Sequence, residues 1–430
     1  MVPVKERMIG LKTKAVRIYG ANDLRLEEFE LPELRDDEIL AKVVSDSLCM
    51  SSYKACVQGP AHKRVPEDVA DHPVIIGHEF CGEILKVGKR WQEEYAPGDK
   101  FAIQPAINLP GNVHAAPGYS FPYIGGDATY IIIPSAFMER GCLLKYTGEA
   151  YYCGSLGEPV SCIIGGFHVN YHTAPGSYIH EMGIKEGGKM ALLAGAGPMG
   201  LGAIDYAMHC DRKPALLVVT DIDAARLSRA ASIYTPEEAA KCGVKLIYAD
   251  TSQYADPVAE LRALADGGYD DVYVYAPVKP VVEQGSAILG QDGCLNFFAG
   301  PTNPQFSAEF NFYNVHYLFT HVAGNSGGNN DDLIEALAMM SEGKINPSSM
   351  ITHVGGLNCV PETTKNLPKI PGGKKLVYTH IDMPLTAIAD FSSLGKTDPL
   401  FAALDEIVSR HNGLWCPEAE RYLLSHAKAV

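Results

Sequence analysis

The 430-residue sequence lacks the closely spaced cysteine pairs that mark structural zinc sites, disulfide frameworks and dithiol redox centres. Its 11 cysteines are scattered along the chain, and no two have the C-x-x-C spacing. An odd number of scattered cysteines in a chain of this size is typical of reduced thiols in the cytoplasm. We therefore predict a cytoplasmic protein without disulfides.

The sequence also lacks an excess of positive charge and any long unbroken apolar run. It has 36 Lys and Arg against 51 Asp and Glu, a net charge of −15, which argues against nucleic acid or an anionic membrane as the main partner. Its most apolar stretch, residues 190–204, is broken by glycines and a proline, so we expect no membrane span. The first ten residues carry no apolar run typical of a secretory signal. Receptor, secreted, fibrous and histone-like classes are therefore set aside.

Two patterns of hydrophobicity divide the chain. Up to about residue 160, short segments rich in β-branched residues alternate with Gly and Pro, which is typical of an irregular β-rich module. From about residue 185, apolar runs recur with helical stretches between them, as in a parallel sheet with crossover helices. These runs are residues 190–194, 215–220, 245–249, 271–276, 294–299 and 319–324. We therefore predict an α/β protein.

A glycine-rich loop joins the first of these runs to a segment with helical spacing. Gly195, Gly197 and Gly200 form a G-x-G-x-x-G motif between this strand and the helix. The first glycine of such a loop allows a tight turn, the second lets the backbone approach a pyrophosphate, and the third lets helix and strand pack closely. Pro198 and Met199 complete the predicted dinucleotide-binding loop, in which the anion lies at the helix N-terminus.

The strand that follows ends at Asp221, 21 residues after Gly200. A carboxylate at this position accepts hydrogen bonds from the ribose hydroxyls and repels a 2′-phosphate, which favours NAD over NADP. Arg226 weakens this preference, although it also fits an ordinary surface helix. NAD is the predicted cofactor, with NADP as the alternative.

Three residues of the N-terminal half offer the donor types of a catalytic zinc site. Cys49, His78 and Glu158 supply a thiolate, an imidazole and a carboxylate, and a catalytic zinc commonly has three protein ligands and one open position. Their separations of 29 and 80 residues do not by themselves show that the three residues form a metal site. Cys49 also fits a small buried hydrophobe, His78 a hydrogen-bonded core histidine, and Glu158 a helix cap or a surface charge.

The order of these signals resembles the zinc-dependent medium-chain alcohol dehydrogenase superfamily, and within it the polyol branch. The matching segments along residues 12–385 are Cys49–Ser51, Pro73–Gly82, Gly98–Phe101, Gly125–Tyr130, Glu158–Pro159, Ser326–Gly328 and Gly343–Ile345. The resemblance implies a GroES-like β-rich catalytic domain and a Rossmann nucleotide-binding domain, with the active site in the cleft between them. It also implies a homodimer or homotetramer that pairs through the nucleotide-binding domain.

The resemblance further assigns roles to individual residues. Cys49, His78 and Glu158 would surround one catalytic zinc ion, with Glu79 as an alternate ligand or as a carboxylate behind the ligands. Ser51 would hydrogen-bond the substrate hydroxyl and pass its proton onward. The zinc would act as a Lewis acid while the substrate alkoxide gives hydride to the nicotinamide ring. Because residues 104–126 contain no cysteine, we expect no second, structural zinc.

Departures from the family pattern point to the substrate. Ser52 stands where the family has an acid, and Lys54 stands where a relay histidine is common. With the basic run His62–Arg64, they favour an anionic substrate such as a sugar or polyol phosphate, although that run also fits a solvated loop. Residues 352–357 and the C-terminal extension are similar to ketose-phosphate reductases of the L-sorbose-1-phosphate type.

The sequence predicts three segments, and two alternative functions fit the same fold. We expect a catalytic domain at residues 1–165 and 350–388, a nucleotide-binding domain at 166–349 and a C-terminal extension at 389–430. A zinc-free reductase of quinones or enoyl thioesters would share the fold but not the metal ligands. A non-catalytic nucleotide-binding protein would keep the fold without the reaction.

Overall fold

The computed structural model describes residues 10–430, which divide into two compact units. Unit 1 holds the residues up to Glu158 together with Ile351–Val430, and unit 2 is Pro159–Met350. The C-terminal extension therefore groups with unit 1. The N-terminal stretch in which we expect no secretory signal lies, Gly10 excepted, outside the described residues. Within residues 10–430, no helix is both long enough and apolar enough to cross a bilayer.

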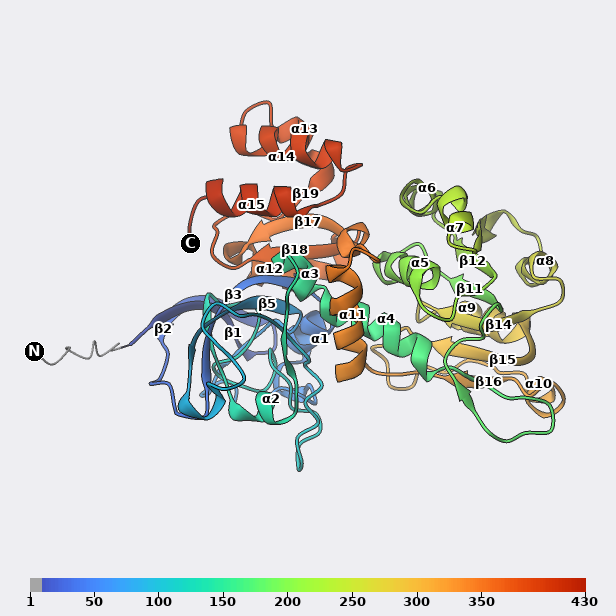
Figure 1. Cartoon of the computed structure of the whole chain (residues 1–430), viewed down its shortest axis with the longest axis horizontal. Helices are drawn as coiled ribbons and strands as arrows, with labels where there is room; N and C mark the ends of the chain where they lie inside the picture. Colours follow the sequence, from blue (N-terminus) through green and yellow to red (C-terminus); the bar gives the residue numbers. More distant parts are fainter. Residues whose placement is uncertain (1–9) are drawn as a thin grey trace, which may run out of the picture. The chain divides into compact units, whose positions relative to one another are not determined.

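Unit 1 is built on two β-sheets (Figure 1). An eight-stranded sheet has the order β19-β17-β18-β3-β5-β6-β8, with β7 also pairing with β3, and a smaller sheet has the order β2-β1-β4. The central strand β3 is rich in apolar residues and almost wholly buried, as expected for a strand covered on both faces. The strands are β1 Lys12–Gly20, β2 Asp23–Glu30, β3 Ile39–Leu48, β4 Val74–Ile75, β5 Phe80–Val87, β6 Lys100–Ile103, β7 Tyr130–Ile133, β8 Leu143–Lys145, β17 Ile351–Gly356, β18 Lys374–Tyr378 and β19 Thr386–Ala387. The predicted β-rich module is thereby confirmed.

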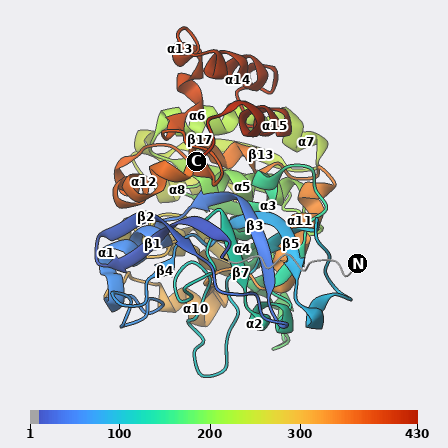
Figure 2. The same cartoon turned by 90° about the vertical axis from the view of Figure 1, so that its left-hand side faces the viewer.

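The helices of unit 1 connect these strands and form the C-terminal extension. They are α1 Met50–Gln58, α2 Ser135–Glu139, α3 Tyr151–Ser155, α12 Val360–Asn366, α13 Phe391–Leu394, α14 Pro399–Arg410 and α15 Pro417–His426. Figures 1 and 2 show α15 between α14 and the strands β17 and β18. Side chains from α14 and α15 share a hydrophobic core with Leu376 and Tyr378 of β18. The extension is thus part of the packed core of unit 1.

A chain of buried hydrogen bonds ties this extension to helix α3. The Trp415 indole donates to the Tyr378 hydroxyl over 2.8 Å, and that hydroxyl donates to the Glu420 carboxylate over 2.8 Å. Glu420 also accepts from the backbone N–H groups of Tyr151 and Tyr152 over 2.7 and 2.8 Å. These two N–H groups open α3 and have no partner within the helix, so Glu420 caps it. The extension therefore fixes the segment that leads directly to the candidate ligand Glu158.

Unit 2 contains one six-stranded parallel sheet with the order β13-β12-β11-β14-β15-β16. Each apolar run expected from the sequence contributes one strand. The strands are β11 Lys189–Leu193, β12 Leu216–Asp221, β13 Lys245–Asp250, β14 Tyr269–Val274, β15 Leu289–Phe297 and β16 His321–Ala323, with a separate hairpin of β9 Tyr171–His172 and β10 Glu181–Met182. This strand order is that of a Rossmann domain, and the predicted fold class is confirmed.

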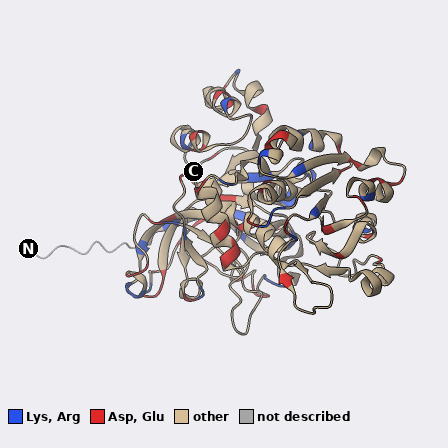
Figure 3. Ribbon diagram, turned by 45° about the vertical axis from the view of Figure 1, so that its right-hand side comes forward, with Lys and Arg blue, Asp and Glu red and all other residues tan. Residues whose placement is uncertain are grey.

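The helices of unit 2 complete its βαβ connections. They are α4 Gly157–Val169, α5 Pro198–His209, α6 Ala224–Ile233, α7 Pro236–Lys241, α8 Pro257–Leu264, α9 Lys279–Ile288, α10 Phe312–Leu318 and α11 Asn330–Ser341. Helix α4 begins in unit 1 and runs into unit 2. The sequence did not indicate α9 or α10 as helices. Acidic and basic residues are interspersed along the ribbon (Figure 3).

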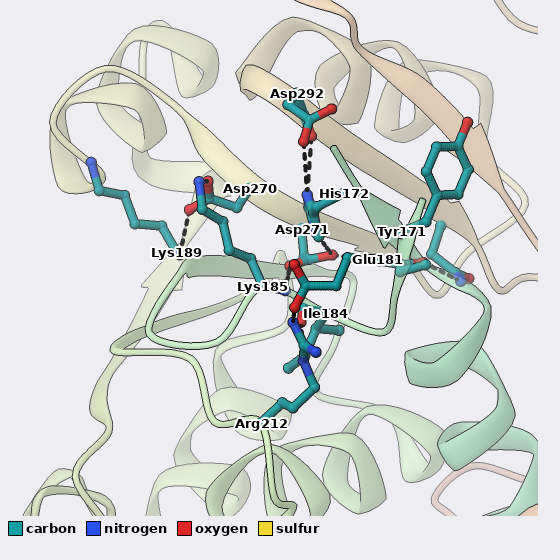
Figure 4. Close-up of polar contacts among 12 residues, drawn as sticks. Tyr171, His172, Glu181, Ile184, Lys185, Lys189, Arg212, Asp270, Asp271 and Asp292 are labelled. Carbon is teal, nitrogen blue, oxygen red and sulfur yellow. Dashed lines mark hydrogen bonds and ion pairs between the residues drawn. The ribbon is translucent and has the colours of Figure 1, made fainter. Parts of the chain in front are cut away.

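A polar network near the start of strands β11 and β14 holds the hairpin of unit 2 against the sheet (Figure 4). The buried carboxylate of Asp271 accepts hydrogen bonds from the Asn170 amide, from the Lys185 backbone N–H and from the His172 ring. Asp292 accepts from the backbone N–H and the hydroxyl of Thr173 over 2.7 and 2.8 Å. A cofactor loop lies beyond the carboxyl ends of parallel strands, so this network at the opposite ends is structural.

Two buried carboxyl groups meet beneath the segment that carries His78. Asp46 and Asp127 are fully buried, and burial raises both pKa values, that of Asp127 to about 8. Among residues 10–430, no group donates a hydrogen bond to either oxygen of Asp127 or to one of the oxygens of Asp46. A proton shared between the two carboxyl groups would satisfy these oxygens, because a protonated carboxyl group donates.

We expect stability to fall as the pH rises because of this pair. The folded chain keeps a proton that the unfolded chain releases near pH 4, so folding becomes less favourable from about pH 4 to about pH 8. The Asp127→Asn variant has an amide group that does not titrate and can donate hydrogen bonds at every pH. Its thermal midpoint should lie several degrees above that of the wild type at pH 8 and near it at pH 5. A variant that is less stable than the wild type by the same amount at both pH values would contradict the shared proton.

Candidate metal and nucleotide sites

Two antiparallel neighbours in the large sheet bring Cys49 and His78 together. Cys49 directly follows β3, and His78 and Glu79 directly precede β5, which pairs with β3. One donor atom from each of Cys49, His78 and Glu79 lies within 4.8 Å of the others. Among residues 10–430, no other set of His, Cys, Asp and Glu side chains is grouped this tightly. The structure therefore joins two of the three predicted ligands and the predicted alternate ligand.

The His78 ring is buried among hydroxyl groups. Ser51 Oγ lies 3.2 Å from Nε2 and Ser52 Oγ 3.3 Å from Nδ1, while the Tyr119 hydroxyl lies 3.0 Å from Nδ1. Burial lowers the pKa of His78 to about 4, so the ring is neutral at pH 7. A neutral imidazole offers a lone pair to a metal, and partners around its ring fix its orientation.

Glu79 is held by a buried lysine that sequence reasoning missed. The Nζ atom of Lys374 lies 2.6 Å from each carboxylate oxygen of Glu79, and the Ser47 hydroxyl donates to one of them over 2.6 Å. Burial alone would raise the pKa of Glu79, but Lys374 outweighs it and holds that pKa below its ordinary value. Because both oxygens already have cationic or hydroxyl partners, this geometry favours Glu79 as a support for its neighbour His78.

Glu158 lies in the first turn of α4, close enough to the cluster to affect it electrostatically. Its charge is one of the causes that raise the pKa of Cys49, after burial and after Glu79. It also raises the pKa of Lys374. Glu158 does not belong to the group of donor atoms within 4.8 Å, which is made up of Cys49, His78 and Glu79.

The donor set fits a zinc ion by its chemistry. A thiol, an imidazole and carboxylates are the ligand types of catalytic zinc. Burial raises the pKa of the Cys49 thiol to about 12, so the site in its metal-free form disfavours the thiolate. A bound cation reverses this preference, because a coordinating thiol loses its proton. The Ser51 hydroxyl, 3.0 Å from Cys49 Sγ, lies beside these donors.

The glycine-rich loop of unit 2 has the close contacts that its motif predicts. A Cβ on Gly200 would lie 1.9 Å from the carbonyl oxygen of Gly195, and a Cβ on Gly195 would lie 2.8 Å from that of Leu192. A Cβ on Gly197 would meet nothing within 4 Å, so this glycine faces open space. Gly197 is also the N-cap of α5, whose first turn holds Pro198 and Met199. The free N–H groups of that helix end suit an anion.

Asp221 lies beside this loop at the carboxyl end of β12. One carboxylate oxygen accepts from the Ala196 backbone N–H over 3.3 Å, and the other accepts from the N–H groups of Ile222 and Asp223. These contacts fix the carboxylate next to the glycine loop. Arg226, in contrast, is exposed on α6 and lies 3.5 Å from Asp223 in an ion pair. The two predicted cofactor residues therefore differ in how firmly the fold holds them.

The predicted substrate residues Ser52 and Lys54 both lie on α1, which directly follows Cys49. Ser52 is buried and contacts His78, as described, so it is part of the packing around that ring. Lys54 lies on α1, and its charge lowers the pKa of His62. Sequence reasoning missed Tyr119, whose only sequence signal is its place between Gly118 and Ser120 in a turn-rich segment.

Comparison with known proteins identifies the family. The alcohol dehydrogenase GroES-like domain matches residues 35–141. Mannitol-1-phosphate 5-dehydrogenase of Aliivibrio fischeri is 53% identical over 414 residues, covering 96% of this chain and 97% of its own. L-sorbose 1-phosphate reductase of Klebsiella pneumoniae is 50% identical over 419 residues, covering 97% and 98%.

A solved structure confirms the fold independently of the close relatives. The 2R,3R-butanediol dehydrogenase of Bacillus subtilis superposes with a TM-score of 0.67 at 23% identity, covering 85% of this chain and 99% of its own. With the full-length relatives, this likeness accounts for both the GroES-like and the Rossmann units. The chain belongs to the zinc-dependent medium-chain alcohol and polyol dehydrogenase family, and it is an oxidoreductase that transfers hydride between an alcohol or ketose and a nicotinamide cofactor.

Proposed function

We propose that the enzyme interconverts a phosphorylated polyol and the corresponding ketose at a single zinc ion. The observation that carries this proposal is the cluster of Cys49, His78 and Glu79, whose donor atoms lie within 4.8 Å of one another. The names of two full-length relatives, a mannitol-1-phosphate dehydrogenase and an L-sorbose 1-phosphate reductase, support a phosphorylated substrate.

In this proposal Cys49, His78 and Glu158 hold the zinc, and Glu79 supports them. Both carboxylate oxygens of Glu79 already accept hydrogen bonds from the Lys374 ammonium group. Glu158 lies in the first turn of α4, and Glu420 holds the preceding helix α3 through two backbone N–H groups. A bound zinc ion lowers the pKa of a coordinated hydroxyl and polarises a carbonyl. The protein's own contribution is to fix the donors and to keep the His78 ring neutral.

Ser51 is proposed to take up the proton of the substrate hydroxyl. Its Oγ lies 3.0 Å from Cys49 Sγ and 3.2 Å from His78 Nε2, so it stands next to any hydroxyl group bound among these donors. A hydroxyl both accepts and donates, which lets Ser51 accept the substrate proton as it passes its own proton on to water while hydride leaves the carbon. Tyr119 contacts the same ring, and burial raises its pKa, so it stays protonated and serves as a donor.

NAD is the proposed cofactor, with Asp221 as the residue that selects it. We expect Asp221→Ala to weaken the binding of NAD about 10-fold to 100-fold and the binding of NADP much less, because the hydrogen bonds from the ribose hydroxyls to the Asp221 carboxylate are lost only with NAD. The measurement is kcat/KM for each cofactor, compared with Asp223→Ala, which removes the N-cap of α6 but no predicted ribose contact. An unchanged ratio between the two cofactors in Asp221→Ala would contradict the assignment.

We also propose that the chain forms a homo-oligomer through the edge of the unit 2 sheet. Strand β16 pairs only with β15 among the described strands, so its outer edge is open. The adjacent α10 and its C-cap expose large apolar side chains, at Phe312, Tyr313, Tyr317 and Phe319. Exposed aromatics beside an open strand edge are typical of an interface. Sedimentation of the purified protein measures the resulting mass.

A substrate panel tests the proposed reaction. Polyols, ketoses and their phosphates are offered with each cofactor, and the nicotinamide absorbance reports turnover. We expect phosphorylated substrates to give the largest kcat/KM. Good turnover of the free polyols with poor turnover of the phosphates would overturn the proposed substrate class.

A further inference from the structure

One arginine beside the metal cluster has no counter-ion among the residues that the structure describes. Arg64 follows α1 in a loop whose backbone is fixed: its carbonyl accepts from the Ser120 hydroxyl over 2.7 Å, and its N–H donates to His62 Nδ1 over 3.3 Å. Its guanidinium carbon lies 5.2 Å from the centre of the Tyr119 ring. That ring lies 5.0 Å from the His78 ring and hydrogen-bonds to it. The Tyr119 side chain therefore links Arg64 to His78, a proposed metal ligand.

The lack of a carboxylate partner distinguishes Arg64 from six other arginines of unit 1. Within residues 10–430, no carboxylate pairs with it, and its Nε atom is buried without a hydrogen-bond acceptor. The arginines that do form ion pairs with carboxylates are Arg17, Arg25, Arg35, Arg90, Arg410 and Arg421. A buried, unpaired donor costs free energy, which a ligand that accepts from it would recover.

The surroundings of Arg64 are positively charged although the protein is acidic. Burial and the charges of Arg64, Lys63 and Lys54 lower the pKa of His62 to about 4, and no carboxylate is among the causes. His62 stacks on Tyr119, with ring centres 5.7 Å apart. Three cations thus form a positive patch around His62, whose ring stacks on Tyr119. An anion with two negative charges suits this patch, and a guanidinium binds phosphate oxygens through two N–H groups at once.

We propose that Arg64 anchors a subsite for the phosphate group of the substrate, with Lys54 and Lys63 adding to the positive field. The subsite rests on the proposed function, because it holds the phosphate of a polyol or ketose whose reacting carbon lies at the Cys49 and His78 centre. The Tyr119 side chain lies between Arg64 and His78 and contacts both. This arrangement makes Arg64 the residue that discriminates phosphorylated from free substrates.

The test compares mannitol 1-phosphate with mannitol for the wild type, Arg64→Gln, Arg64→Lys and Arg90→Gln. Arg90 is a matched control, because it pairs with Glu139 on the surface of the same unit. We expect Arg64→Gln to lose about 100-fold in kcat/KM for the phosphate, mainly through KM, and little for mannitol. Arg64→Lys should recover part of this loss, and Arg90→Gln should behave as the wild type.

A second readout does not depend on turnover. Inorganic phosphate should raise the thermal midpoint of the wild type and of Arg90→Gln but not that of Arg64→Gln. An Arg64→Gln variant that loses the same factor on both substrates, or that still responds to phosphate, would overturn the subsite. If the wild type does not prefer the phosphorylated substrate but phosphate binding still requires Arg64, the proposed function fails and the anion site stands.

Discussion

Replacing Cys49 by serine is expected to abolish both zinc binding and hydride transfer while leaving cofactor binding intact. A serine hydroxyl is a far poorer zinc ligand than a thiolate. Zinc supplies several kcal/mol of transition-state stabilisation, so kcat/KM should fall at least about 1,000-fold. The glycine loop and Asp221 belong to unit 2, and the change leaves them untouched. Zinc content, turnover and NADH fluorescence titration measure the three quantities separately.

Cys242→Ser is the matched control for this prediction. Cys242 is also a free, partly exposed thiol, but it lies in unit 2 at the end of α7. This variant should keep its zinc and its activity. Full activity or full zinc content in Cys49→Ser would remove Cys49 from the ligand set.

Lys374→Met is expected to give the largest loss of stability. The ion pair between Lys374 and Glu79 is almost fully buried, with side-chain exposures of 8% and 1%. Removing only the lysine leaves the Glu79 carboxylate uncompensated in the core, which costs about 3–5 kcal/mol. The pKa of Glu79 is lower in the folded chain than in the unfolded chain, so the ion pair stabilises the fold fully at a pH above the unfolded pKa. The wild type should lose this stability as the pH falls through the folded pKa. Urea denaturation at pH 7 measures the difference.

Two further variants identify the cause of that loss. The double variant with Glu79→Gln and Lys374→Met removes both charges and should be more stable than Lys374→Met alone. Lys145→Met breaks the exposed pair with Asp99 and should cost less than about 1 kcal/mol. If Lys374→Met cost no more than Lys145→Met, the buried pair would not be a stabilising element.

The nucleotide site could be predicted from the sequence because its chemistry is local. Gly195, Gly197 and Gly200 act through backbone geometry within six residues, and Asp221 follows at the end of the next strand. Alternating strands and helices also predict a parallel sheet directly. The one cofactor residue that the fold holds loosely is Arg226, whose exposed position gives no distinctive sequence signal.

The metal site could be predicted only in part, because its supports are distant in the chain. Cys49 and His78 belong to recognisable motifs, but Lys374 lies 295 positions from Glu79 and reaches it only because β18 pairs with β3. A pair of lysines before an apolar run gives no sign that one of them is buried. Glu420 and Trp415 likewise act through contacts with α3 and β18 that depend on the packing of the C-terminal extension.

X-ray absorption at the zinc edge of the purified holoenzyme tests the central claim most directly. The account predicts one zinc ion per chain with a single sulfur ligand at about 2.3 Å and the other ligands, nitrogen and oxygen, at about 2.0–2.2 Å. The sulfur contribution should disappear with the zinc in Cys49→Ser and persist in Cys242→Ser. A zinc ion with no sulfur ligand, or with several, would contradict a site built from Cys49, His78 and a carboxylate.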